Sequence, residues 1–273
     1  MEIHPLLIFS DLDGTLLGHQ NYGFDAALEA LGKIGRNKTP LILNSSKTRS
    51  EMLSIRKKMH NNHPFVVENG AAIYVPSGIF SQYSDDLTEL SLGVSRKNIL
   101  QFIHQLRDQK RYSFKGFADF TLDELIAETG LSKQQAEQAR DRTGSEPIKW
   151  LDTEENLQFF KQAIEQQGLK LLKGGRFLHV MGQTDKAKAM RILVDLYRNE
   201  FQQDYKTIAM GDSQNDKLML EQADFSGIIK PEKGSELEIE KEDNVYYSTL
   251  PAPKGWQEVM NKILNLIESK ENR

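Results

Sequence analysis

Two aspartates, Asp11 and Asp13, directly follow the apolar stretch Leu6-Leu-Ile-Phe-Ser10. The stretch predicts a β-strand, and the alternation of an extended backbone sends both carboxylates to one side of its carboxyl end, where open α/β sheets bind ligands. Such a pair can divide the work of phosphoryl transfer: one acid attacks phosphorus and holds a cation, while the other gives a proton to the leaving oxygen and later takes one from water. The bare pattern also fits a strand that ends in a turn with solvated acids.

A second acidic group follows the strand-like run Thr207–Met210, in Gly211-Asp-Ser-Gln-Asn-Asp216. Asp212 lies on the turn, and Asn215 and Asp216 lie where the next helix begins. Oxygen ligands of this kind suit Mg²⁺, which keeps several waters and takes one or two protein carboxylates. We expect Asp212 to be a direct ligand and the other two to be ligands or to act through water. Simple helix N-capping is the alternative.

Two further groups can meet the negative charge of a phosphate. Ser45 follows the strand-like Leu41–Leu43 and precedes a helix, so its hydroxyl and the neighbouring N–H groups can bind phosphoryl oxygens at a positive helix end; plain N-capping by the serine is the alternative. Lys186 and Lys188 begin a later helix, and one of the two could neutralise both the nucleophile and the transferring group. A solvated surface lysine is the alternative here.

Short apolar runs near both ends of the chain alternate with amphipathic helical segments. This pattern predicts an α/β fold with a doubly wound, Rossmann-like parallel sheet. From about Asp85 to Gly182 the pattern changes to mixed helices and short strands, which indicates an α+β lobe inserted over the carboxyl edge of the sheet. The predicted division is 1–84 core, 85–182 inserted cap and 183–273 core. The clearest predicted elements are the strands Leu6–Phe9, Leu41–Leu43, Phe65–Val67 and Thr207–Met210 and the helices Phe24–Ile34, Arg49–Met59 and Lys186–Phe201.

The composition excludes several classes of protein. A formal net charge of −4 gives no basic field to attract nucleic acid or anionic lipid. The absence of cysteine excludes disulfides, thiolate metal sites and a cysteine nucleophile. The N-terminus does not read as a signal peptide, and no apolar stretch approaches the roughly 18 residues of a membrane helix. We therefore expect a soluble, cytoplasmic protein without nucleic-acid or membrane partners; the sequence is silent on its oligomeric state.

Four pieces in this order resemble the motifs of the haloacid dehalogenase superfamily: Asp11-Leu-Asp-Gly-Thr15, the strand-terminal Ser45, Lys186 and Gly211-Asp-Ser-Gln-Asn-Asp216. Glu68-Asn-Gly-Ala71 resembles the Cof-type branch, in which a cap is inserted between the second and third motifs. The resemblance spans the whole chain.

The resemblance implies a metal site and its surroundings. Asp11 would be the nucleophile and a Mg²⁺ ligand, and Asp13 would be the general acid and base with its backbone carbonyl on the metal. Asp212 would be the third protein ligand. Asn215 and Asp216 would orient Asp212, the motif lysine or metal-bound water.

The implied reaction passes through an aspartyl-phosphate on Asp11, with Ser45 and Lys186 holding the phosphoryl oxygens. A catalytically idle protein that binds a sugar phosphate is an alternative of another class, but such a site has no need of both Asp11 and Asp13. A nucleotide-binding Rossmann enzyme is disfavoured because no Gly-x-Gly-x-x-Gly follows the first strand.

Within the branch, the chain is most similar to the mannosyl-3-phosphoglycerate phosphatases. Ser45-Ser-Lys-Thr-Arg49 stands where most relatives carry Thr-Gly-Arg or Ser-Gly-Arg, and Gly174-Gly-Arg-Phe177 before His179 resembles a piece of that family's cap. The implied reaction converts mannosyl-3-phosphoglycerate to mannosylglycerate and phosphate. Sucrose phosphate, trehalose phosphate and simple hexose phosphates are the alternative substrates.

A substrate of this class also carries a glycerate carboxylate. Arg176, beside the flexible Gly174 and Gly175, is the predicted fork-shaped clamp on that group, and Lys47 and Arg49 are further predicted cationic contacts. An exposed arginine on a strand, or a surface ion pair of Arg49 with a glutamate, explains the same residues without a substrate.

Overall fold

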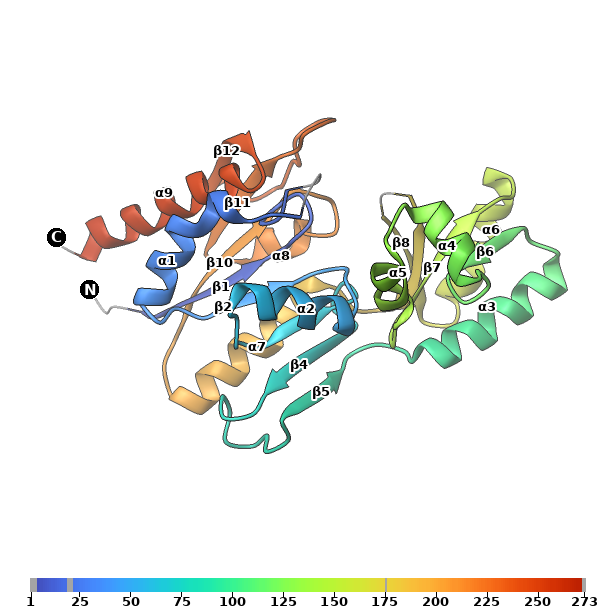
Figure 1. The fold of residues 1–273 in the computed structure, drawn as a ribbon, viewed down its shortest axis with the longest axis horizontal. Helices are drawn as coiled ribbons and strands as arrows, with labels where there is room; N and C mark the ends of the chain where they lie inside the picture. The colour runs from blue at the N-terminus through green and yellow to red at the C-terminus, as the bar shows by residue number, and fades with distance from the viewer. Residues whose placement is uncertain (1–3, 19–21, 175, 272–273) are drawn as a thin grey trace.

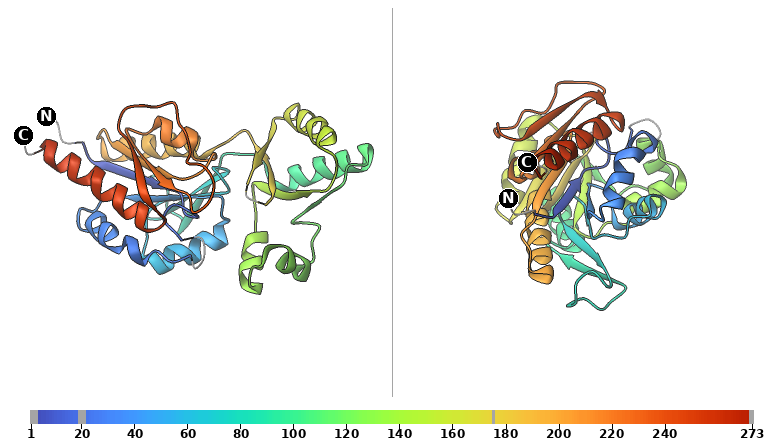
Figure 2. Two further views of the ribbon diagram at one scale, coloured as in Figure 1. Left: turned by 90° about the horizontal axis from the view of Figure 1, so that it is seen from above. Right: turned by 90° about the vertical axis from the view of Figure 1, so that its left-hand side faces the viewer.

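The computed structural model describes residues 4–18, 22–174 and 176–271. Two lobes lie side by side along the long axis, and both chain ends lie at the far end of the larger lobe, away from the smaller one (Figures 1 and 2). The larger lobe is the core and the smaller one is the inserted cap. None of the described helices is long and apolar enough to cross a membrane.

The core is built on an eight-stranded sheet with the strand order β12-β11-β10-β1-β2-β3-β4-β5. Its strands are β1 (Leu6–Ser10), β2 (Leu41–Asn44), β3 (Phe65–Val67), β4 (Ala72–Pro76), β5 (Leu87–Ser91), β10 (Lys206–Gly211), β11 (Phe225–Lys230) and β12 (Val245–Pro251). Its helices are the short 3₁₀ helix η1 (Asp25–Ala27), α1 (Leu28–Arg36), α2 (Arg49–Met59), α7 (Lys186–Phe201), α8 (Lys217–Gln222) and α9 (Lys254–Glu271).

All neighbouring strands from β12 to β3 are parallel, and β4 and β5 complete the sheet in antiparallel pairing. Helices cover both faces of the parallel part, which confirms the predicted doubly wound α/β fold. A parallel sheet that is buried on both faces requires strands with near-continuous apolar sequence, and β1 and β2 have this composition.

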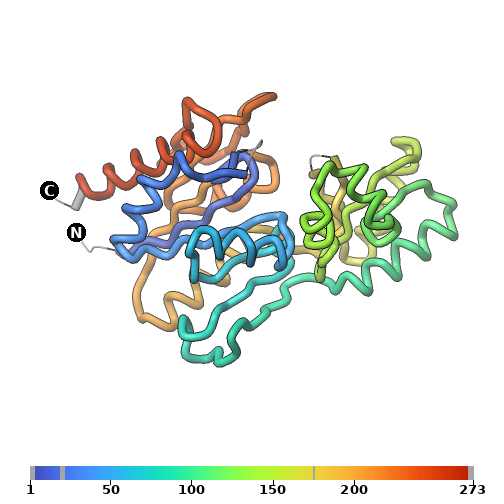
Figure 3. The backbone as a smooth tube through the Cα atoms, viewed as in Figure 1, coloured from blue at the N-terminus to red at the C-terminus, as the bar shows by residue number. Residues whose placement is uncertain are grey.

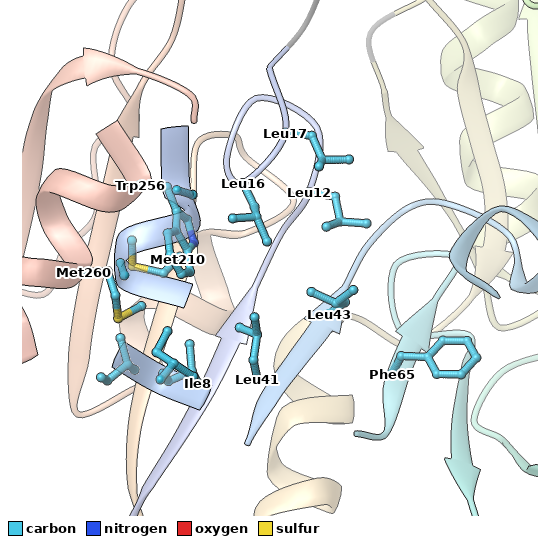
Figure 4. Packing of buried hydrophobic residues seen from close by; sticks show 14 of the residues in the cluster. Ile8, Leu12, Leu16, Leu17, Leu41, Leu43, Phe65, Met210, Trp256 and Met260 are labelled. Carbon is cyan, nitrogen blue, oxygen red and sulfur yellow. The ribbon is translucent and has the colours of Figure 1, made fainter. Parts of the chain in front are cut away.

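Alternate residues of β1 pack on opposite faces of the sheet. Ile8 joins the cluster formed with α1 and α9, part of which is drawn in Figure 4. Leu7 and Phe9 join the cluster formed with α7 and α8. Continued for two residues, the same alternation directs Asp11 toward α7. The packing of the first strand therefore sets the direction of the first acidic side chain.

The cap contains a four-stranded antiparallel sheet with the order β6-β7-β9-β8. Helices α3 and α6 bury one face of this sheet, and α4 and α5 form a smaller apolar cluster beside it. The elements are α3 (Arg96–Lys110), β6 (Phe114–Gly116), α4 (Leu122–Thr129), α5 (Lys133–Arg140), β7 (Ser145–Trp150), α6 (Glu154–Glu165), β8 (Leu169–Lys173) and β9 (Leu178–Gly182).

The chain enters and leaves the cap at one place, which Figure 3 traces as two adjacent connections. Gly93 lies on the way in and Gly182 on the way out. A Cβ on Gly182 would lie 2.8 Å from the backbone nitrogen of Val94, so the two connections touch and a larger residue would force them apart. We call this contact the neck.

The predicted start of the cap at residue 85 is too early. Strand β5, Leu87–Ser91, pairs with β4 in the core sheet, so the first core segment extends to at least Ser91. This edge strand is half-exposed and rich in polar residues, unlike the apolar strands at the centre of the sheet. Its sequence therefore carries the composition of a connecting segment rather than that of a buried strand.

Candidate active site

The loop after β1 is a tight turn that holds the first two acids. The Asp11 backbone N–H donates to the Met210 carbonyl at 3.0 Å, which ties the strand end to β10. Gly14 has φ 81°, a conformation that favours glycine, and its N–H donates to the Leu17 carbonyl at 3.0 Å. The Thr15 hydroxyl donates to Asp212 Oδ1 at 2.7 Å. The turn thus links two acidic loops that are far apart in sequence.

Lys186 lies at the centre of the site. It is the first residue of α7, its side chain is fully buried, and its Nζ lies 2.6 Å from both Asp11 Oδ1 and Asp216 Oδ1. Burial opposes the charge of this lysine, but the two carboxylates outweigh burial and raise its pKa. The Lys186 carbonyl accepts a hydrogen bond from Asn44 Nδ2 at 3.0 Å. Lys186 is therefore a charged, fixed contact of the predicted nucleophile, not a surface lysine.

Asp216 occupies the N-cap position of α8, yet its carboxylate makes no capping bond to that helix. Its Oδ1 is taken by Lys186, and its Oδ2 accepts the backbone N–H groups of Asp212 and Ser213 at 3.2 and 3.1 Å. The simple helix-capping interpretation is therefore wrong for this residue. The Oδ1 of Asp216 thus binds Lys186, and its Oδ2 shapes the loop that carries Asp212.

Asp212 shares a crowded negative region with the other acids. Burial, followed by the charges of Asp11 and Asp216, raises its pKa to about 8. Asp11, Asp212 and Asp216 each offer a ligand atom, and these atoms all lie within 4.8 Å of one another. The buried Oδ1 of Asp13 has no hydrogen-bond partner in the structure. Carboxylates held this close repel one another, and a bound cation would offset the repulsion. An all-oxygen donor set fits a hard divalent ion such as Mg²⁺.

Lys47, one of the predicted substrate contacts, lies against Asp13. Its Nζ is 2.8 Å from Asp13 Oδ2 and 4.0 Å from Glu51 Oε1. Burial lowers the pKa of this lysine, but Asp13 and Glu51 outweigh burial and raise it. Arg49 is exposed, and its guanidinium lies over the Tyr74 ring, 5.6 Å from the centroid. The substrate contacts predicted for these two cations stay predictions.

Ser45 is buried at the end of β2, but it does not cap the next helix. Helix α2 begins at Arg49, and its N-cap is Thr48, which forms a reciprocal capping box with Glu51. The Ser45 N–H donates to the Val66 carbonyl at 3.1 Å, and its hydroxyl accepts the Lys47 N–H at 3.3 Å. The N-capping alternative for Ser45 is wrong, and the contact of its hydroxyl with a phosphoryl oxygen stays a prediction.

The loop at residues 68–70 was recognised in the sequence only as a family signature, and the structure gives it contacts on three sides. Its residues Glu68, Asn69 and Gly70 have φ of 49°, 57° and 92°. The Asn69 N–H donates to the Ser45 carbonyl at 2.9 Å, and its Oδ1 accepts a hydrogen bond from Asn215 Nδ2 at 3.0 Å. The loop at residues 68–70 therefore joins the loop that contains Ser45 to the loop before α8.

Glu68 connects the core to the cap. Its side chain is buried and accepts hydrogen bonds from the N–H groups of Thr143 and Gly144 at 2.8 and 3.3 Å, and from the Ser145 hydroxyl. The guanidinium of Arg142 lies 3.8 Å from the same carboxylate. One core side chain thereby holds the segment between α5 and β7. No periodicity in the sequence signals such a role.

Arg176, the predicted carboxylate clamp, is exposed in the cap. Its guanidinium donates to the carbonyls of Glu128 and Thr129 at 3.0 and 2.6 Å, at the carboxyl end of α4. The guanidinium of Arg176 is thus hydrogen-bonded to backbone groups of the cap itself. Gly175, predicted beside it, lies outside the described residues. A role for either residue in binding substrate stays a prediction.

The match to a known family decides the class of this site. Residues 8–230 match the family of haloacid dehalogenase-like hydrolases. The chain belongs to this family. The matched span runs from the strand before Asp11, through the cap, to the strand after Asp216, so it contains every acid and lysine described above.

Two curated relatives align with nearly the whole chain. Both are named glucosyl-3-phosphoglycerate/mannosyl-3-phosphoglycerate phosphatase. The protein from Persephonella marina is 34% identical over 269 residues, covering 96% of this chain and 98% of the relative. The protein from Methanococcoides burtonii is 33% identical, covering 97% and 98%. The resemblance that the short motifs predicted is thereby confirmed.

Solved structures share the complete two-lobed fold. A Thermoplasma acidophilum protein superposes with a TM-score of 0.65 at 18% identity, covering 97% of this chain and 99% of that protein. A haloacid dehalogenase-like hydrolase from Bacteroides thetaiotaomicron gives 0.62 at 15% identity, covering 95% and 99%. At these identities the likeness concerns the fold alone.

Proposed function

We propose that this protein is a Mg²⁺-dependent phosphatase that hydrolyses hexosyl-3-phosphoglycerates through a phosphorylated Asp11. The chain is a phosphoric monoester hydrolase, and the observation that carries this assignment is the contact of Asp11 with the fully buried Lys186 at 2.6 Å, inside a group of three acids. A carboxylate fixed in this way at a strand end, next to a cation site, is equipped to attack phosphorus.

The metal would be held by Asp11, Asp212 and the backbone carbonyl of Asp13. When bound, Mg²⁺ supplies positive charge to the phosphoryl oxygens. Asp216 supports this arrangement without being a ligand, because its oxygens already bind Lys186 and two backbone N–H groups. The oxygen donors and the raised pKa of Asp212 both fit a divalent cation in this place.

The reaction has two halves. In the first, an Asp11 carboxylate oxygen forms a bond to phosphorus, the bond from phosphorus to the substrate oxygen breaks, and the carboxylic acid of Asp13 protonates the departing alkoxide. In the second, water attacks the phosphorus and gives a proton to the Asp13 carboxylate, and the bond to Asp11 breaks. Phosphate leaves, and both acids return to their starting forms.

The other residues of the site orient these two acids and offset charge. Lys186 fixes Asp11 by a direct contact and adds positive charge beside the transferring group, and the Ser45 hydroxyl can donate to a phosphoryl oxygen. Lys47 holds the side chain of Asp13 at 2.8 Å, so it sets the direction of the proton donor rather than that of the substrate. The chemistry is thereby assigned to residues of the core.

The substrate class is supported by the two relatives that align with almost the whole chain and are named for both glucosyl- and mannosyl-3-phosphoglycerate. The prediction from sequence was the phosphate ester of a sugar-glycerate, with the mannosyl compound as the favoured one. We propose that both hexosyl-3-phosphoglycerates are hydrolysed, giving the hexosylglycerate and phosphate. Sucrose phosphate, trehalose phosphate and simple hexose phosphates are the competing substrates of the same chemistry.

Phosphate release with Mg²⁺ from a panel of these esters tests the substrate class. We expect kcat/KM to be highest for the two hexosyl-3-phosphoglycerates and activity to disappear with EDTA and return with Mg²⁺. Equal or faster hydrolysis of simple hexose phosphates would refute the assignment of substrate.

Replacement of the nucleophile tests the covalent step. D11N should lower kcat by about 10⁴-fold or more, because an amide neither attacks phosphorus nor holds the cation. The matched control is D25N, at an exposed aspartate of η1, which should keep wild-type activity. Substantial activity in D11N would exclude the aspartyl-phosphate.

A further inference from the structure

Strand β8 places one lysine on the inner face of the cap sheet. Leu169 and Leu171 belong to the apolar cluster with α3 and α6, so they point to the helix-covered face. By the alternation of a strand, Lys170 and Leu172 point to the opposite face. That face is turned toward the core, because Lys170 and Leu172 line one cavity together with residues of the core; β8 is the cap strand drawn on the side of the core in Figure 1.

A cavity of about 80 Å³ lies between this face and the catalytic loops. The cap contributes Lys170 and Leu172, and the core contributes Asn69, Asp185, Lys186, Gln214, Asn215 and Leu218. Lys186, which lines this cavity, is also the direct contact of Asp11, the predicted nucleophile. At roughly 30 Å³ per water-sized group, it has room for a carboxylate but not for a hexose ring.

Lys170 is a half-buried cation of the cap sheet. Among the residues that the structure describes, no carboxylate forms an ion pair with it within 4.0 Å. The charge of Asp185 attracts Lys170. The Oδ1 of Asp185, however, already accepts the Lys188 N–H at 2.7 Å as the N-cap of α7. Burial outweighs the attraction of Asp185 and lowers the pKa of Lys170. A half-buried cation without a partner is suited to an anionic ligand.

Arg176 differs from Lys170 in this respect. Its donors already bind the carbonyls of Glu128 and Thr129, so binding a substrate there requires those two hydrogen bonds to break. Lys170 loses only water when it binds an anion. Of the two cap cations, Lys170 therefore has the bonding capacity that a second anionic group of the substrate needs.

We propose that Lys170 binds the glycerate carboxylate of the substrate and makes the enzyme selective for phosphate esters that carry this group. The assignment rests on the proposed function, since the carboxylate belongs to the hexosyl-3-phosphoglycerate class. It places the recognition of the second anion on β8 rather than on the loop between β8 and β9.

The test compares two substrates that differ only in this group: glucosyl-3-phosphoglycerate and the analogue in which the carboxylate is reduced to a hydroxymethyl group. K170M should lower kcat/KM for the phosphoglycerate by about 10- to 100-fold, mainly through KM, as expected for the loss of one charge-assisted hydrogen bond. The value for the analogue should stay near that of the wild type. K170R should retain most of the selectivity.

Lys173→Met is the matched control, because Lys173 is exposed on the same strand and points to the other face. It should leave both substrates unaffected. Equal losses for the two substrates in K170M, or loss of selectivity in R176M but not in K170M, would overturn the assignment.

The two proposals fail in different ways. If the wild-type enzyme does not prefer the phosphoglycerate to its analogue, the proposed substrate class is wrong. If the wild type has this preference and K170M keeps it, only the role of Lys170 is wrong.

Discussion

The core side and the cap side of the cleft use their charged residues differently. On the core side, the Lys186 ammonium and the Asp216 carboxylate are fully buried and bonded to each other and to their neighbours. On the cap side, Lys170 is half-buried and forms no ion pair with a described carboxylate. Under the proposed roles, the difference teaches where each task lies: groups that perform chemistry are fixed before substrate arrives, and the group that recognises it keeps bonding capacity free.

The physical reason is the cost of burying charge. A buried carboxylate without a partner is strongly destabilising, so Asp11 and Asp216 require the Lys186 ammonium that binds them both. A cap cation that stays partly hydrated has no such requirement, and it exchanges water for a ligand when one binds. Three changes test this contrast.

The largest effect is expected on the core side, from K186M. Removal of this ammonium leaves Asp11 and Asp216 buried without their shared partner, which should reduce the free energy of unfolding by about 3–5 kcal/mol. It should also lower kcat by about 10²-fold or more. Urea unfolding and steady-state kinetics measure the two effects. Lys188 begins the same helix without an ion pair to a described residue, so K188M is the control, and equal losses in both variants would remove the distinction between them.

A smaller effect is expected where the two sides meet, from E68Q. An amide cannot accept all the hydrogen bonds that the cap donates to Glu68, so the free energy of unfolding should fall by about 1–3 kcal/mol and KM should rise. Urea unfolding and kinetics again give the answer. The control is E89Q, whose carboxylate accepts a hydrogen bond from Tyr74 within the core. An unchanged KM in E68Q would show that this contact does not help to assemble the cleft.

The smallest effect concerns the pH dependence of the cap, through His179. Burial, aided by the charge of Arg142, lowers the pKa of His179 from 6.5 to about 3. Because the unfolded chain binds a proton below pH 6.5 and the folded chain does not, this histidine stabilises the fold above pH 6.5, and that contribution is lost as the pH falls toward 3. Between pH 6.5 and 5.5 the wild type should lose about 1 kcal/mol more than H179Q in urea unfolding. Parallel losses would contradict this.

Much of the fold was predictable because local signals were strong. Helices Arg49–Met59 and Lys186–Phe201 were predicted with the bounds that the structure has, since polar residues stand directly before each. The N-cap of α2 was not recognised, although Thr48-Arg-Ser-Glu51 carries the capping-box pattern that identifies it. The polar edge strand β5 was missed because its composition is that of a loop.

The site was predictable as a set of residues but not as a set of contacts. The order of the motifs indicated Asp11, Lys186 and Asp212, whereas the bond between Lys186 and Asp216 depends on how α7 crosses the sheet. The hydrogen bond of Glu68 with Thr143 of the cap joins residues 75 positions apart in the sequence. Glu68 also has a positive φ, and a glutamate gives no sign of this conformation in the sequence. Alternation in β8 was readable from sequence, but the face that meets the core was not.

The neck, where Gly182 touches the entering chain beside Val94, makes the cap a closed module. Its two ends meet at one point, so a cap that keeps the contacts with Glu68 can be exchanged through a single insertion point in the core. New substrate preferences can therefore arise by recombination of whole caps, without any change to the strands that hold the nucleophile. A chimaera that joins this core to a relative's cap at the neck would keep its phosphoryl chemistry and take its selectivity from the donor.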